Sequence, residues 1–214
     1  ALLGIASLIA VPLGLLAGIY LAEYGRGRLA GALSLSADVL TGFPSILVGF
    51  FVFLSLASLD PRLVTSSYAG GIALAILMLP LVARSTEVAL RAVPAHLREA
   101  ALALGFPKRR VTLRIAIGNS VAGLLTGLLL AIARAGGETA ALLMTTGTSL
   151  FYARGLSGPT AALPTLIYND GLSGYPNWQS VAWGATLVLL AGMLGVGLAS
   201  RWVLRAAPRA GGAP

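Results

Sequence analysis

The chain is organised as apolar runs separated by short polar segments. Five runs of transmembrane length are visible, and a weaker apolar run follows the fourth of them. The five cover residues 1–22, 38–59, 69–83, 115–133 and 180–200, and the weaker run covers 139–150. About 20 apolar residues are enough for a helix to cross the hydrocarbon core of a bilayer. The apolar residues are contiguous and do not alternate with polar ones, which argues against a transmembrane β-barrel. The pattern therefore predicts an all-α, polytopic transmembrane helical bundle with five spans.

Composition agrees with a membrane protein and excludes several kinds of chemistry. Hydrophobic residues make up 57% of the 214 positions and charged residues only 10%, whereas about a quarter of a soluble domain is charged. The chain has no cysteine, so disulfides and thiol chemistry are excluded. The single histidine, His96, stands in a basic segment without the cluster of ligands that a metal site needs. A net charge of +8 is compatible with nucleic-acid binding, but in a membrane protein the location of the charges is more informative than their sum. We therefore expect no nucleic-acid partner.

Basic residues are concentrated in alternate polar segments. Of the fifteen, two lie in 23–37, seven in 84–114 and three in the C-terminal tail. The positive-inside rule assigns these segments to the cytoplasm, which places residue 1 outside and the C-terminus inside. Arg62 and Arg154 fall on the opposite side. The chain begins within an apolar run and without an initiator methionine, so we expect a sixth span upstream in the parent protein.

The longest basic segment, 84–114, contains a predicted short helix. The sequence AHLREAALALG (95–105) is rich in strong helix formers and ends at Gly105, a favourable C-terminal cap. Leu97, Ala101 and Leu104 follow helical spacing and form an apolar stripe. A helix of three turns is marginal alone in water. Its stripe either docks on another protein or on the bundle, or lies on the lipid surface.

The same segment resembles the EAA loop of ABC importer permeases. That family's pattern is Glu-Ala-Ala, three residues, glycine, nine residues, isoleucine, one residue, Leu-Pro. The matching positions are Glu99, Ala100, Ala101, Gly105 and Ile115. The final Leu-Pro is replaced by Ile117-Gly118. The resemblance implies that this helix is a coupling helix, seated in a cleft of a cytoplasmic ATPase.

Further segments resemble one branch of that family, the PstA permeases of phosphate ABC transporters. They are GIYLAEYG (18–25), ADVLTGFPSILVGFF (37–51), LPLVARSTEVALRAVPAHLREAALALG (79–105), LLAIARAGGETAALL (129–143) and ALPTLIYN (162–169). The branch commonly has proline where this chain has Ala141. The resemblance implies one transmembrane domain, 1–205, with a coupling loop at 84–114. The distribution of basic residues places the segment 151–179 outside the cell and the tail 206–214 in the cytoplasm.

The resemblance also implies the partners. This subunit would pair with a homologous second permease, with a dimeric cytoplasmic ATPase and with an extracytoplasmic phosphate-binding protein, in the inner membrane of a prokaryote. ATP and magnesium would bind the ATPase, because no Gly-Lys-Ser/Thr phosphate loop occurs in this chain. We therefore expect a chain that is not itself an enzyme and holds no cofactor.

An arginine and a glutamate interrupt the apolar sequence LAIARAGGETAALLM (130–144). Charges inside a span are rare and costly. Gly136 and Gly137 lie between Arg134 and Glu138 and predict a break in the helix. On one hypothesis the two charges form an i,i+4 ion pair on one helix face. On the other, Arg134 attracts a phosphate oxyanion and Glu138 holds Arg134 or acts as a gate.

Hydroxyl side chains near this sequence are secondary candidates for the pathway. Thr139 would add a hydroxyl donor beside Glu138, and Thr145 and Thr146 either do the same or bond back to helix carbonyls. Ser45 and Thr41, on either side of Pro44, are candidate pore-lining residues.

Three other function classes remain to be weighed. A permease of the same fold could carry sulfate, molybdate or phosphonate. An ion-coupled carrier would need several intramembrane acids, and only Glu138 and Asp38 qualify. An intramembrane enzyme would need a nucleophile–base pair or metal cluster, and the sequence has no such constellation.

Overall fold

A computed structural model of the chain describes residues 1–147 and 155–206. Arg154, Arg209, the end of the run 139–150, the start of the segment 151–179 and the tail beyond residue 206 lie outside the described residues. The described residues form helices and turns and no strand, so the all-α fold is confirmed. In chain order the elements are α1 (Leu2–Ile19), the π-helical turn η1 (Tyr20–Tyr24), α2 (Arg28–Gly42), α3 (Ser45–Leu59), the 3₁₀ turn η2 (Pro61–Leu63), α4 (Ser67–Arg91), α5 (Ala95–Ala103), α6 (Lys108–Arg110), the π-helical turn η3 (Val111–Ala116), α7 (Ile117–Gly136), α8 (Ala140–Thr145), α9 (Leu163–Gly171) and α10 (Pro176–Ala206).

Within the described part of the chain, four helical segments are long and apolar enough to cross a membrane. They are Leu2–Tyr24, Ser67–Arg91, Lys108–Gly136 and Pro176–Ala199. The apolar run 38–59 is not one straight helix, because α2 and α3 meet there at an angle of 103°. The cause is Pro44, since the residue before a proline is displaced from the helical region; Phe43 is extended, with ψ of 134°. The bent pair counts as a fifth span if its two halves cross together.

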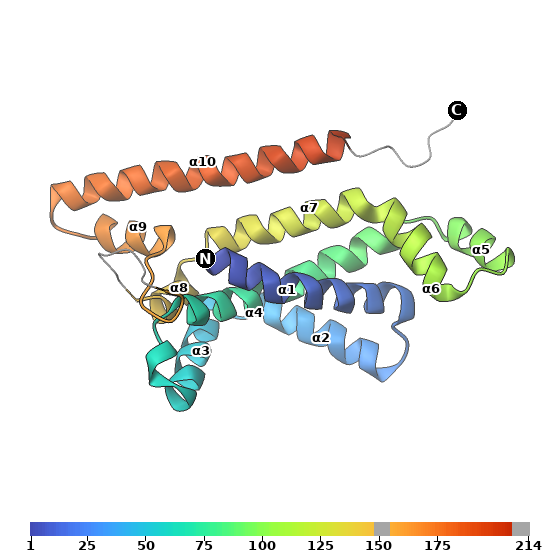
Figure 1. The fold of residues 1–214 in the computed structure, drawn as a ribbon, viewed down its shortest axis with the longest axis horizontal. Helices are drawn as coiled ribbons and strands as arrows, with labels where there is room; N and C mark the ends of the chain where they lie inside the picture. The colour runs from blue at the N-terminus through green and yellow to red at the C-terminus, as the bar shows by residue number, and fades with distance from the viewer. Residues whose placement is uncertain (148–154, 207–214) are drawn as a thin grey trace.

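Helix α4 forms the centre of the bundle, with α1 and α2 running beside it (Figure 1). The main core cluster joins α1 to α4 through small and aliphatic side chains such as Ala6, Ala10, Leu74 and Val82. Gly18 of α1 allows the two helices to approach closely. A Cβ atom there would lie 2.5 Å from the carbonyl oxygen of Ala83. Small residues at such spacing are how membrane helices pack without a hydrophobic driving force.

Replacing Gly18 with alanine is expected to destabilise the bundle, because the added Cβ meets backbone that cannot rotate away. Overpacking of this kind costs about 1–3 kcal/mol. Gly4→Ala is the matched control, since it lies in the same helix with no atom within 4 Å of its Cβ position. The melting temperature of the purified protein checks the prediction. Equal melting of the two variants would contradict it.

The basic segments gather toward one end of the bundle. Figure 1 shows the connection between α1 and α2, the helices α5 and α6, and the C-terminal end of α10 toward the same end. The segment 84–114 is not entirely a loop, because α4 continues to Arg91. Arg84 is tolerated inside this helix because its guanidinium pairs with Asp38 of α2 at 2.5 Å and with Glu87 at 2.8 Å.

Candidate functional site

The helix that carries Arg134 ends just after it, as the two glycines predict. Helix α7 stops at Gly136, and a new short helix, α8, begins at Ala140. Gly137 and Glu138 form the turn, with their amides donating to the carbonyl oxygens of Arg134 and Ala135, each at 3.2 Å. The predicted break is therefore confirmed.

The i,i+4 ion pair between Arg134 and Glu138 is not formed. None of the ion pairs between described residues joins the two side chains. The reason is the break, because Glu138 has left the helix on which an i,i+4 pair would be aligned. The two charges therefore stand at a helix end without neutralising each other by direct contact.

Both charges line one small cavity of about 100 Å³. Its other walls come from α4 and from the bend between α2 and α3. The lining residues are Leu40, Thr41, Phe43, Ser45, Leu77, Leu81, Arg134 and Glu138. The break between α7 and α8 thus faces the bend at Pro44. Thr41 and Ser45, both secondary candidates from the sequence, lie beside Arg134 and Glu138.

The cavity lies near the middle of the central span. Helix α4 has 25 residues and is about 38 Å long at 1.5 Å per residue. Leu77 and Leu81 line the cavity and lie about 15 and 21 Å along that axis. Broken helices that meet near the midplane are a common way to build a transporter site, because freed backbone groups line a cavity there.

The three threonines near the break between α7 and α8 differ in their hydrogen bonds, and none of them lines the small cavity. Thr139 stands at the N-cap position of α8 without a side-chain capping bond, and it is not among the residues that line the cavity. Thr145 and Thr146 donate to the carbonyl oxygens of Ala141 and Leu142 at 2.9 and 2.8 Å. These two hydroxyls therefore bond back to their own helix, one of the two alternatives that the sequence leaves open.

A glycine that the sequence did not single out positions α8. A Cβ atom at Gly49 of α3 would lie 2.5 Å from the carbonyl oxygen of Ala141. Helix α8 therefore packs directly on the α3 backbone, which carries the far side of the bend at Pro44. The break and the bend are held together by this contact.

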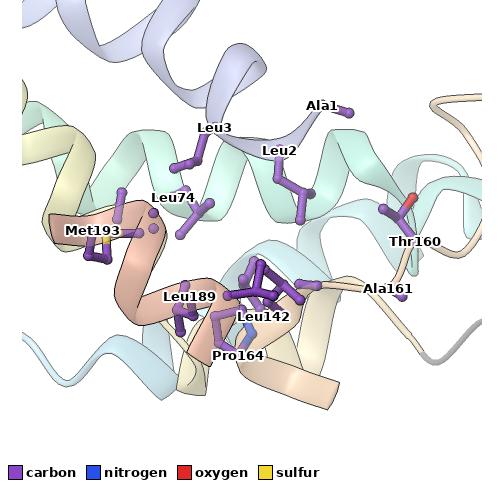
Figure 2. A pocket seen from close by; sticks show the side chains of 16 residues that line it. Ala1, Leu2, Leu3, Leu74, Leu142, Thr160, Ala161, Pro164, Leu189 and Met193 are labelled. Atoms are coloured by element: carbon purple, nitrogen blue, oxygen red, sulfur yellow. The ribbon is translucent and has the colours of Figure 1, made fainter. Parts of the chain in front are cut away.

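A larger cavity, of about 400 Å³, lies between α1, α4 and α10. Figure 2 shows Leu2, Leu3, Leu74, Leu189 and Met193 around it. The side chain of Thr160 is the polar one among its lining residues. An anion would lose its hydration there without gaining a charged partner. The smaller, charged cavity is the better candidate for an anion.

The second candidate site is the helix α5, which the EAA resemblance marks as a coupling helix. It ends in a Schellman motif: the amide of Phe106 donates to Ala101 at 3.2 Å and that of Gly105 to Leu102 at 2.9 Å. Gly105 has φ of +81°, a conformation that favours glycine. The predicted helix and its glycine cap are confirmed.

Helix α5 presents part of the EAA segment to its surroundings. Glu99 and Ala100 are exposed, and Ala101 is buried against the bundle. The predicted apolar stripe does not form one face, since Leu104 is 77% exposed while Ala101 is 6% exposed. Leu104 lies past the end of the helix, where the chain turns. Further exposed apolar side chains of this region are Leu97, Leu102 and Phe106.

Sequence reasoning missed two long-range ion pairs. Arg84 of α4 binds Asp38 of α2, and Arg98 of α5 binds Glu23 of η1. Acidic residues and arginines beside apolar runs indicate that ion pairs form there, but the sequence does not indicate which acid pairs with which arginine. Because Asp38 is paired with an arginine, it is not a free acid of the kind an ion-coupled carrier needs. The described residues also hold no group of three His, Cys, Asp or Glu that could bind a metal.

Comparison with known proteins places the chain in a family. Residues 11–209 match the family described as binding-protein-dependent transport system inner membrane component. The phosphate transport system permease protein PstA of Yersinia pestis is 46% identical over 185 residues, which cover 86% of this chain and 62% of that protein. PstA 1 of Mycobacterium tuberculosis (strain CDC 1551 / Oshkosh) is 40% identical over 213 residues, covering 96% and 68%. The chain thus spans about two thirds of the length of these relatives.

A solved structure shares the fold. The chain aligns with an inward-facing structure of the MetNI methionine ABC transporter with a TM-score of 0.73, covering 95% of this chain and 88% of that one. Identity is 18%, so this likeness concerns the fold alone. The family match confirms the resemblance to ABC importer permeases seen in the EAA segment. The chain belongs to the family of binding-protein-dependent transport system inner membrane components.

Proposed function

We propose that this chain is a permease subunit of an ATP-driven importer and forms half of the membrane pathway for inorganic phosphate. The observation that carries the proposal is the cavity near the middle of α4, where Arg134 stands without an ion pair to Glu138. A guanidinium donates two parallel hydrogen bonds to phosphate oxygens. The PstA names of the relatives support phosphate as the substrate.

In this mechanism Glu138 keeps the affinity low. An anion that binds too tightly does not leave, so a pathway needs a site that is attractive and also readily vacated. Glu138 lines the same cavity as Arg134 and repels an anion that stays there. Ser45 contributes a hydroxyl to the opposite wall, whereas the hydroxyl of Thr41 donates to the carbonyl oxygen of Ala37 at 2.7 Å. Thr139, at the N-cap position of α8, is a further hydroxyl of the break.

The partners follow from the same proposal. A homologous permease completes the pathway, a cytoplasmic ATPase dimer binds ATP and magnesium and receives α5, and an extracytoplasmic protein delivers phosphate. The chain itself catalyses no reaction. The end of the bundle that carries α5 and the C-terminal end of α10 faces the cytoplasm of a prokaryotic cell, because basic segments are retained on that side.

Uptake by the reconstituted complex tests the proposal. Vesicles that contain the two permeases and the ATPase are expected to take up labelled phosphate only when both ATP and the binding protein are supplied. Labelled sulfate is the matched control substrate. Uptake of sulfate in place of phosphate would overturn the substrate, and uptake without ATP or the binding protein would overturn the importer.

A further inference from the structure

The side chain of Arg98 makes an unusually complete set of contacts for a residue of a short peripheral helix. Its Nε and Nη2 atoms donate to Oε1 of Glu23 at 3.0 and 2.7 Å. Its Nη1 and Nη2 atoms donate to the carbonyl oxygens of Val93 and Leu90, both at 2.6 Å. All three nitrogens of the guanidinium are therefore bonded, and their acceptors lie in two separate parts of the chain.

These contacts are withdrawn from solvent. The side chain of Arg98 is 20% exposed and that of Glu23 only 6%. Surface ion pairs contribute little because water screens them, but a buried pair is sensitive to the loss of either partner. Leu90 lies in the last turn of α4, where carbonyl oxygens lack i+4 partners within the helix; its oxygen also accepts from the amide of Val93 at 3.2 Å. Arg98 therefore caps α4 from the neighbouring helix α5.

Glu23 connects the same arginine to the first span. It lies in the π-helical turn η1, directly after α1. The hydroxyl of the next residue, Tyr24, lies within hydrogen-bond distance of the Thr112 hydroxyl of η3, at 3.3 Å, and its ring lies beneath Lys108 at 4.8 Å. The turn η1 thus contacts α5 and the elements that follow it in the chain. Helix α1, which leads into η1, packs closely on α4 at Gly18, and α4 leads through the turn at 92–94 into α5.

We propose that Arg98 is a positioning residue that makes α5 move as one body with α1 and α4. The proposal rests on the proposed function, in which α5 receives the movement of the ATPase. The covalent links from α5 to α4 and α6 are short turns, at 92–94 and 104–107, and each contains a proline or glycine at which the chain changes direction. Without Arg98 these turns absorb the movement of α5. With Arg98 the movement reaches α4, which lines the cavity of Arg134 at Leu77 and Leu81.

The first measurement is the amount of phosphate imported per ATP hydrolysed by the full complex. Arg98→Met is expected to lower this ratio about tenfold, as a loss of about 1.4 kcal/mol of coupling between α5 and α4 would, while ATP hydrolysis continues. Arg109→Met is the matched control, since Arg109 is an exposed arginine in the adjoining segment. An unchanged ratio in Arg98→Met would overturn the proposal.

A double variant separates positioning from folding. Arg98→Met alone leaves the buried Glu23 without its arginine, which lowers stability. The double variant Arg98→Met, Glu23→Met removes both charges and is expected to recover much of the melting temperature. The import ratio should stay low in it, because the link between α5 and η1 is still missing. Recovery of the ratio together with stability would overturn the positioning role.

The last measurement does not depend on transport. The chain has no cysteine, so spin labels can be placed at Ala103→Cys on α5 and Leu16→Cys on α1, both exposed. In the assembled complex the distance between the labels is expected to be narrowly distributed when Arg98 is present and broadly distributed in the Arg98→Met variant. Identical distributions would overturn the proposal. If the complex with Arg98 imports no phosphate, the proposed function fails, and the label distances still decide whether Arg98 holds α5.

Discussion

Arg134→Ala is expected to lower phosphate uptake by the assembled importer about 100-fold or more, because each hydrogen bond to a charged group is worth about 1.5–3 kcal/mol and each 1.4 kcal/mol is about tenfold. The side chain lines the cavity near the middle of α4 and is exposed in this chain, so it is accessible to an anion in the pathway. Arg134→Lys keeps the charge but loses the two-pronged donor, so we expect an intermediate rate. Initial rates of labelled phosphate uptake into vesicles compare both variants with the unaltered importer.

Two control variants test whether the loss of uptake is specific to Arg134. Arg109→Ala removes an exposed arginine from α6 and is expected to leave uptake nearly unchanged. The double variant Arg134→Ala, Glu138→Ala asks whether the two charges only balance each other. Restored uptake in the double variant would contradict a role for Arg134 in attracting the anion. It would favour a structural pair that forms in another state of the importer.

Glu99→Ala and Gly105→Ala are expected to leave the bundle folded and to reduce phosphate uptake per ATP hydrolysed about tenfold, as loss of about 1.4 kcal/mol of docking energy would. Glu99 is exposed on α5, so in the proposed importer it is accessible to the ATPase. Gly105 has φ of +81°, so alanine strains the turn by about 1–2 kcal/mol and tilts the end of the helix. Uptake and ATP hydrolysis are measured on the same vesicles.

Gly27→Ala is the matched control for strain. Gly27 also has a positive φ, of 79°, and no atom within 4 Å of its Cβ position, but it joins α1 to α2 and not to the coupling helix. A loss of coupling in Gly27→Ala as large as in Gly105→Ala would show that backbone strain anywhere at this end is sufficient. Normal coupling in Glu99→Ala would contradict the docking of this helix on the ATPase.

Local signals in the sequence predicted the helices well. Four of the apolar runs correspond to α1, α4, α7 and α10, and the C-terminal glycine of the helix at 95–105 takes the predicted turn. These features depend on neighbours within a few residues, such as helix formers, a glycine cap or two adjacent glycines. The same is true of the break after Arg134. Its cause, Gly136 and Gly137, lies within the segment itself.

Two features depart from the simplest interpretation of the apolar and charged pattern. The apolar residues of 38–59 are continuous in sequence, but Pro44 divides the run into α2 and α3, which meet at 103°. The charges of residues 84–91 predict a loop, whereas α4 continues to Arg91. These residues remain helical because Asp38, far away in the sequence, neutralises Arg84 and Glu87 lies between two arginines.

Local hydrophobicity, charge and helix propensity were enough to establish the class of this protein, four of its spans, the basic segments and the break beside Arg134. Each of these features depends on residues that are neighbours in the chain. The tertiary structure was needed to show that Arg134 and Glu138 share a cavity with Thr41 and Ser45 without pairing, and that Arg98 binds Glu23. Such contacts join segments that are far apart in the sequence. At Gly18 helix α1 lies directly against the carbonyl oxygen of Ala83 in α4, and at Gly49 helix α3 lies directly against that of Ala141 in α8.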